Sequence, residues 1–86
     1  MPEQKIGSVF KFFAKVSVAA IQVTDGEVAV GDTMHFKGAT TDFTQTIESM
    51  EIDRQRVERA GPGSSIGIKV RERVRPGDLV FKVTAQ

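Results

Sequence analysis

The feature that most constrains this chain is a short pattern, Val-x-x-Gly-Asp, which occurs twice and leads each time into an apolar run. The pattern spans residues 28–32 and 74–78, and the runs that follow cover 33–37 and 79–83. Glycine supplies the positive φ that a tight turn needs, and the aspartate can hydrogen-bond the backbone just beyond it. Pro76 suits the first central position of the second turn because its ring fixes φ. Two such strand entries in one short chain predict a small β-barrel.

The length and composition predict one ordinary globular domain. The chain has 86 residues, of which 40% are hydrophobic and 27% charged, so we expect a single domain over residues 1–86 with the barrel from about 5 to 84. No apolar run approaches the roughly 18–20 residues of a membrane span, and residues 1–5 do not resemble the start of a secretory signal. The chain has no cysteine and therefore no thiolate chemistry. We expect a cytoplasmic protein with no membrane partner.

Runs that either alternate between apolar and polar residues or are mostly apolar and β-branched, bounded by turn signals, predict a series of strands. These cover residues 5–13, 16–23, 27–30, 33–37, 43–53, 65–71 and 79–83. Residues 54–60 fit either a short strand or one helical turn, with Val57 pointing inward. No segment has helical spacing, and turn signals recur every several residues. This combination favours a closed antiparallel barrel of six or seven strands over a sandwich, because closure removes exposed sheet edges.

Local signals refine these strands. Asp25-Gly26 predicts a hairpin turn, because both central positions of the favoured turn need positive φ. Within residues 43–53 the apolar residues change parity between Ile47 and Met50. One face can stay buried only if an extra residue is inserted, so we predict a β-bulge near Glu48-Ser49.

Turn and core residues in a fixed order resemble the second domain of translational GTPases such as elongation factor Tu. They are Val30-Gly31-Asp32, Gly38, residues 44–50, Ala60-Gly61 with Gly63, Gly67 and Gly77-Asp78. Residues 41–50 also resemble small stand-alone proteins of prokaryotes that are similar to elongation factors, and related barrels are appended to collagenase-like peptidases. The resemblance spans residues 5–83 and implies an all-β barrel of the translation-protein type.

In elongation factors the resembling domain contacts the acceptor end of aminoacyl-tRNA, the GTPase domain or ribosomal RNA. This chain has no Gly-x-x-x-x-Gly-Lys-Ser/Thr loop, so it lacks the backbone cradle that would hold nucleotide phosphates. We therefore expect no nucleotide, no cofactor and no GTPase activity from the chain by itself. The resemblance transfers the fold and leaves the ligand open.

The charges are unevenly distributed although the net charge is only +1. Residues 54–75 hold seven basic and two acidic side chains, and the rest of the chain holds five basic and nine acidic ones. If the chain stays extended after residue 65, cations at steps of two share one face, with Val70 and Val74 behind them. Such a row can follow a nucleic-acid backbone, and the alternative is a solvated strand whose arginines pair with nearby acids. The candidate RNA-binding residues are Lys69, Arg71, Arg73, Arg75, Arg54 and Arg56.

Three phenylalanines near the end of the first predicted strand, Phe10, Phe12 and Phe13, occupy both of its faces. At least one ring must then lie outside the core unless a bulge intervenes. An exposed ring could stack on a base or seat against a partner protein, whereas the structural alternative buries both faces at a barrel corner. These three residues are the candidate partner contacts.

Catalytic and metal chemistry have little support in the sequence. His35 is the only histidine, and its parity places it on the outer face beside Thr33 and Lys37 without an adjacent serine. One histidine and no cysteine make a metal site improbable. Glu48, Glu51 and Asp53 form the nearest approach to a carboxylate cluster, which a barrel strand more often presents to solvent.

The sequence therefore predicts a non-catalytic barrel module that binds RNA, either tRNA or ribosomal RNA, through the basic strand face. The alternative is a protein-interaction module that docks onto a separately encoded GTPase or enzyme. An exposed apolar patch around the phenylalanines would favour the alternative.

Overall fold

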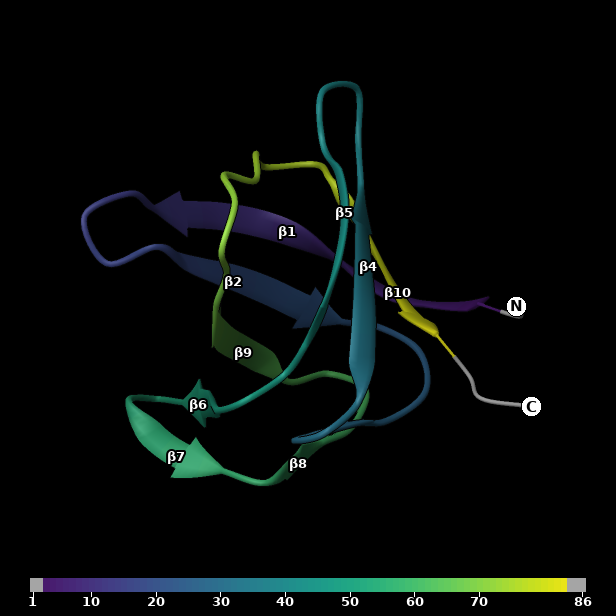
Figure 1. The fold of residues 1–86 in the computed structure, drawn as a ribbon. Coiled ribbons are helices and arrows are strands. Elements are labelled where there is room, and N and C mark those ends of the chain that lie inside the picture. The colour runs from purple at the N-terminus through teal and green to yellow at the C-terminus, as the bar shows by residue number, and fades with distance from the viewer. Residues whose placement is uncertain (1–2, 84–86) are drawn as a thin grey trace.

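The computed structural model describes residues 3–83, in which every regular element is a β-strand (Figure 1). The ten strands are β1 (Glu3–Phe13), β2 (Val18–Val23), β3 (Val28–Ala29), β4 (Thr33–Lys37), β5 (Asp42–Thr46), β6 (Met50–Ile52), β7 (Gln55–Val57), β8 (Arg59–Ala60), β9 (Ser65–Lys69) and β10 (Leu79–Val83). The all-β prediction is confirmed. The predicted barrel end at residue 84 and the first two residues of the N-terminal segment lie outside the described residues. Residues 3–83 contain no helix with the length and hydropathy that crossing a membrane requires.

Eight of the strands form one antiparallel sheet, in the order β5-β4-β10-β1-β2-β9-β6-β7, and β3 pairs with β8 in a small second sheet. Across residues 3–83 no ladder joins the two edge strands, β5 and β7, so the hydrogen-bonded ring of a closed barrel is not formed. The sheet nevertheless curves, and its first edge strand runs into β6 through only three residues, 47–49. There are more strands than the predicted six or seven because the long predicted segments are divided.

One apolar core lies inside the curved sheet. Alternate residues of each strand enter it, among them Met34 and Phe36 of β4 and Ile66 and Ile68 of β9. The ring of Phe36 stacks on that of Phe43 at a centroid separation of 5.0 Å. The predicted alternation of buried and exposed residues is therefore confirmed in β4 and β9.

Both Val-x-x-Gly-Asp segments form the same corner. In each, the last four residues make a turn whose third residue, Gly31 or Gly77, has a φ of 99° or 95°, and the aspartate amide donates to the carbonyl three residues earlier at 3.1 and 3.0 Å. Each aspartate Oδ2 also accepts the amide hydrogen of that same earlier residue, at 2.9 Å in both turns. The positive φ at the third position is typical of a type II turn. The predicted hydrogen bond from the aspartate to the backbone beyond it is wrong, because the carboxylate instead accepts from a residue earlier in the chain.

The predicted irregularity in residues 43–53 is confirmed in position, although it is a break and not a bulge. Strand β5 ends at Thr46 and β6 begins at Met50. In the break, the Ile47 amide donates to the carbonyl of Asp32 at 2.9 Å, and its carbonyl accepts the amide hydrogen of Gly31 at 2.9 Å. Ile47 and Met50 are both buried as a result. The change of parity is absorbed by the three residues of the break, of which Ile47 pairs with the first corner.

The predicted hairpin at Asp25-Gly26 is wrong. Only Gly26 has positive φ there, and the strands on either side pair elsewhere, β2 with β1 and β9, and β3 with β8. A two-residue hairpin lies instead between β6 and β7, where Ile52 pairs with Gln55. Its central residues, Asp53 and Arg54, have φ of 52° and 65°. This is the double positive φ of a type I′ turn, made without glycine.

Residues 54–60, left open between a strand and a helical turn, contain the short strands β7 and β8. Val57 is half-buried and packs against the core, as predicted. The strand predicted for residues 65–71 ends two residues early, at Lys69, which changes how the following basic residues are placed.

Candidate functional site

The strongest candidate site is an open groove of about 400 Å³ on the outer face of the sheet. Strands β1, β2, β9 and β6 contribute to it, together with the turns beside them. Its lining residues are Phe10, Phe13, Val16, Val18, Ala20, Glu51, Asp53, Arg54, Ser65, Ile66 and Gly67. The turn between β1 and β2, which carries Val16, projects from the rest of the fold (Figure 1).

A bulge in β1 accounts for the exposed aromatic rings. The pairing of β1 with β2 shifts register between Val9 and Lys11, so the intervening Phe10 leaves the alternation. The side chains of Phe10 and Phe13 are 50% and 44% exposed, and Phe12 is half-buried against the core. Two of the three candidate partner contacts therefore lie on the surface, whereas Phe12 contributes to the interior. The sequence argument allowed all three rings to be buried if a bulge intervened, but here the bulge is present and two rings still lie outside the core.

The floor of the groove consists of small residues. Ala20 of β2 faces Gly67 of β9 across the ladder, and Gly67 faces Glu51 of β6. A Cβ atom added at Gly67 would meet only Val18 Cγ1, at 3.4 Å. The hollow thus arises because two adjacent strands present almost no side chain, while Phe10 and Phe13 rise beside them.

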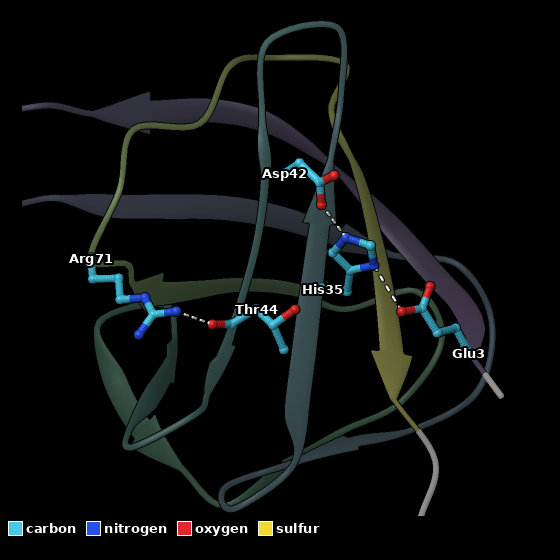
Figure 2. A network of polar contacts seen from close by, with 5 residues as sticks. All are labelled: Glu3, His35, Asp42, Thr44 and Arg71. Carbon is cyan, nitrogen blue, oxygen red and sulfur yellow. Dashed lines mark hydrogen bonds and ion pairs between the residues drawn. The ribbon is translucent and has the colours of Figure 1, made fainter. Parts of the chain in front are cut away.

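The predicted basic row does not lie on one strand. Strand β9 ends at Lys69, and residues 70–78 form an irregular connection to β10. Val70 and Val74 are buried behind the cations as predicted, at 3% and 1% exposed. The row is interrupted at Arg71, because its guanidinium donates to the carbonyl oxygen of Thr44 in β5 (Figure 2).

The side-chain amide of Gln45 continues the sheet where β9 stops. Its Nε2 donates to the carbonyl of Lys69 at 2.8 Å, and its Oε1 accepts the amide hydrogen of Arg71 at 2.9 Å. The amide therefore occupies the place that a neighbouring backbone would take. A second, more polar hollow of about 360 Å³ lies here, lined by Gln45, Thr46, Glu48, Ser49, Lys69, Val70 and Arg71.

The other basic candidates are exposed but divided. Arg54 lines the apolar groove, Lys69 and Arg71 line the polar hollow, and Arg73 and Arg75 belong to the connection before β10. Arg56 of β7 faces Glu51 in the neighbouring strand. The role of these six residues in contacting RNA stays a prediction, and the function built on it is corrected below.

His35 of β4 joins three strands through two carboxylates (Figure 2). Its Nδ1 lies 2.8 Å from Glu3 Oε2 of β1, and its Nε2 lies 2.6 Å from Asp42 Oδ1 of β5. The ring also lies 6.1 Å from that of Phe81 in the intervening β10. The prediction of an outward-facing histidine is correct, but its two partners were missed, because Glu3 is 32 residues away in the sequence and the contact with Asp42 depends on the register of β4 with β5.

The two carboxylates determine what His35 can do. The hydrogen bond to Asp42 is the main cause that raises the pKa of His35 above 6.5, against partial burial and with help from Glu3. The same hydrogen bond lowers the pKa of Asp42 below 3.8. Carboxylates accept hydrogen bonds, so both contacts are satisfied only by the imidazolium, which has no free lone pair. This geometry suits a cross-strand clamp and does not suit a general base.

The candidate carboxylate cluster is separated. Glu48 lines the polar hollow, whereas Glu51 and Asp53 line the apolar groove. Sequence reasoning assigned none of the three to a groove, because the floor made by Ala20 and Gly67 appears only when strand register is known. The signal in the sequence was that Ala20 and Gly67, both small, occupy outward-facing positions of their strands.

Two sequence relatives are peptidases by name. The chain is 35% identical over 78 residues to a collagenase of Porphyromonas gingivalis and 38% identical over 78 residues to an uncharacterised protease of Methanocaldococcus jannaschii. Each match covers 90% of this chain but only 22% and 19% of the relatives, so the chain spans about a fifth of their length. No protein-family model matches the chain.

Two solved structures share the fold. Both are of the C-terminal domain of a protein described as a U32 peptidase, from Geobacillus thermoleovorans. One gives a TM-score of 0.86 at 23% identity, covering 94% of this chain and 93% of the domain. The other, a selenomethionine variant, gives 0.84 at 22% identity, covering 90% and 96%.

These matches overturn the resemblance to the small stand-alone proteins similar to elongation factors and to elongation factor Tu, and with it the predicted RNA-binding function in protein biosynthesis. The residues that carried the resemblance close corners and turns, as Gly31-Asp32 and Gly77-Asp78 do here. Such residues specify a chain path and do not identify a family. The chain is similar in sequence to part of a collagenase and of an uncharacterised protease, and it has the fold of the C-terminal domain of a U32 peptidase.

Proposed function

We propose that this chain is a non-catalytic docking domain that binds the catalytic part of a collagenase-like peptidase. The apolar groove on the outer face of β1, β2, β9 and β6 carries the proposal. Most of each named relative lies outside the stretch that this chain matches, and we assign the peptidase chemistry to that remainder. The domain would then seat its groove against the remainder, within one polypeptide or as a separate subunit.

The energetics favour covering this groove. Phe10, Phe13 and Val16 are 50%, 44% and 57% exposed and line the same hollow. Burying a large apolar side chain contributes about 1.5–3 kcal/mol when it passes fully out of water. Contiguous apolar surface beside a polar rim is typical of interaction sites.

The state of His35 supports a role without catalysis. Both of its ring nitrogens face carboxylate oxygens, at 2.8 and 2.6 Å. A general base needs a free nitrogen within reach of the proton that it removes. In this domain the histidine holds strands together.

The test uses a collagenase-like peptidase from which the matching stretch has been deleted, checked for folding by circular dichroism. Calorimetric titration with the intact chain should show saturable binding. A Phe10→Ser, Phe13→Ser double variant should bind at least about tenfold more weakly, because two contact rings are lost. Val30→Ser is the matched control, since Val30 is 40% exposed and does not line the groove. Failure of the intact chain to bind at about 0.1 mM, or equal binding by the double variant, would overturn the proposal.

We also propose that the curved sheet behaves as a closed barrel, with Gln45 completing the ring between β5 and the residues after β9. The bonds from its side chain to Lys69 and Arg71 support this. Hydrogen exchange should show protection of the Arg71 amide that Gln45→Ala removes and the control Gln55→Ala, on exposed β7, leaves intact. An Arg71 amide that exchanges at the unprotected rate in the unaltered chain would contradict closure.

A further inference from the structure

The two ends of the apolar groove carry opposite charges. Strand register sets out one row of outward side chains across four strands: Lys11 of β1 faces Ala20, Ala20 faces Gly67, and Gly67 faces Glu51. The row thus runs from a cation over two small residues to an acid. Aromatic side chains flank the cationic end, and the turn between β6 and β7 flanks the acidic end.

The cation at the aromatic end is already engaged. Lys11 Nζ lies 5.1 Å from the centroid of the Phe13 ring, a cation–π contact. The ammonium group therefore covers one ring, and Lys11 does not line the groove. An incoming group meets chiefly Phe10, Phe13 and Val16 on this side.

The acids at the other end are available. Within residues 3–83 the ion pairs are those of His35 with Glu3 and Asp42, and that of Lys82 with Asp32. Glu51 and Asp53 are both exposed, both line the groove, and belong to none of these pairs. Arg54 shares this rim, so the rim of the groove has two carboxylates and one guanidinium.

We propose that the groove binds a segment of its partner in which a large apolar side chain stands next to a lysine or arginine. The apolar side chain lies on the Ala20–Gly67 floor against Phe10 and Phe13, and the neighbouring cation reaches the carboxylates of Glu51 and Asp53. This inference rests on the docking function and specifies the chemistry of the docked segment. Charge complementarity favours the cation, because the groove lining has two carboxylates against the single guanidinium of Arg54.

A proline-rich segment fits less well. Grooves that bind such segments recognise their backbone carbonyls through donors beside aromatic rings. The rings here belong to phenylalanine, which has no hydrogen-bonding group. The acceptors at the rim instead suit a positively charged side chain.

The experiment compares three short synthetic peptides that share a Gly-Ser frame and differ at a central tripeptide, Leu-Arg-Phe, Leu-Glu-Phe or Ser-Arg-Ser. Nuclear magnetic resonance titration of the intact chain gives both the affinity and the place of binding. Leu-Arg-Phe should shift the amide signals of Ala20 and Gly67. The Leu-Glu-Phe and Ser-Arg-Ser peptides should bind about tenfold more weakly, since each lacks one of the two recognised groups.

Two variants tie the result to the named residues. Reversing the rim with Glu51→Lys and Asp53→Lys should exchange the preference, so that Leu-Glu-Phe binds better than Leu-Arg-Phe. Gly67→Val should abolish binding by filling the floor, and its Cβ atom has room beside Val18. Thr44→Lys, on exposed β5 outside the groove, is the matched charge control and should leave the preference unchanged.

The outcomes separate this inference from the docking function. Equal affinity for the arginine and glutamate peptides, or shifts away from Ala20 and Gly67, would overturn the inference alone. So would peptides that do not bind while the shortened peptidase does. If neither the peptides nor the shortened peptidase binds, both the inference and the docking function fail.

Discussion

At the scale of single residues, the two Gly-Asp corners show how few atoms position a strand. In each corner the aspartate carboxylate accepts the amide hydrogen of the residue three positions earlier, and the glycine has the positive φ. The corner before β10 has an additional constraint, because Asp78 is only 5% exposed and lies against Gly38 of the β4–β5 connection. A Cβ atom at Gly38 would lie 2.0 Å from Asp78 Oδ1.

We therefore expect Gly38→Ala to lower the free energy of unfolding by about 1–3 kcal/mol, because the buried carboxylate cannot move without losing its bond to the Arg75 amide. Urea denaturation measures the effect. Gly61→Ala is the matched control, since no atom lies within 4 Å of its added Cβ and its φ is not positive. Equal losses in the two variants would show that Asp78 does not confine Gly38.

The carboxylate clamp on His35 gives a dependence on pH with a defined sign. The raised pKa of His35 contributes stability that is fully present below 6.5 and is lost as pH rises through the folded-state value. The lowered pKa of Asp42 contributes stability that is present above 3.8 and is lost as pH falls through the folded-state value. The clamp is therefore strongest between these two limits.

His35→Gln should consequently cost most stability at about pH 5.5 and progressively less toward higher pH, because the native imidazole loses its proton as the pH passes the raised folded-state pKa. Urea midpoints of both proteins across this range measure the difference. The control is Thr33→Gln, another outward position of β4, which should show no such trend. A cost that does not fall as the pH is raised from about 5.5 into the alkaline range would exclude the imidazolium clamp.

At the scale of strands, the apolar pattern of the sequence predicts where strands begin and end, but not which strands pair. The apolar runs that follow the two Gly-Asp corners predict β4 and β10 with their observed bounds, and the change of parity after Ile47 locates the break between β5 and β6. Both features depend only on which residues must be buried. The hairpin at Asp25-Gly26 was wrong because the dipeptide permits a turn without choosing the partners of the strands beside it.

The hairpin of β6 and β7 was missed for the opposite reason. Its turn has Asp53 and Arg54 at positive φ, and although aspartate is favoured at the first of these positions, arginine occupies the second, where glycine would have indicated the turn. Pairing of Met50 and Ile52 with Val57 and Gln55 holds the turn in place. The pairing of β6 with β7 therefore overrides the backbone preference of the two turn residues.

Arg54→Gly should then raise the free energy of unfolding by about 0.5–1 kcal/mol, because glycine takes positive φ without steric cost. Thermal or urea denaturation measures the gain. Gln55→Gly, one residue later in the regular part of β7, is the matched control and should lower stability by a similar amount. A loss with Arg54→Gly would mean that the guanidinium contributes more than the turn strain costs.

At the scale of the whole molecule, the last strand occupies the middle of the sheet. Strand β10 pairs with β1 on one side and β4 on the other, so the sheet joins segments from both ends and the middle of the chain. The sequence pattern predicts that β10 exists but not where it pairs, because order within a sheet depends on contacts far apart in the sequence. The groove and the contact of His35 with Glu3 escaped prediction for the same reason.

Removing residues 79–86 should therefore abolish cooperative unfolding, because both neighbours of β10 lose their ladders. Circular dichroism during a urea titration tests this. Phe81→Thr keeps the strand and shortens only its half-exposed side chain, so it should retain a cooperative transition. A cooperative transition in the shortened chain would mean that the remaining strands form the core alone.

The pairing of Glu3 with Val83 has a further architectural consequence. Ladder partners lie only about 5 Å apart, so the chain enters and leaves this domain through neighbouring points. This geometry would allow the whole domain to be inserted into a surface loop of another protein through two short linkers. The same geometry would let the unit be joined to a larger enzyme by either connection while the groove keeps its orientation relative to that junction.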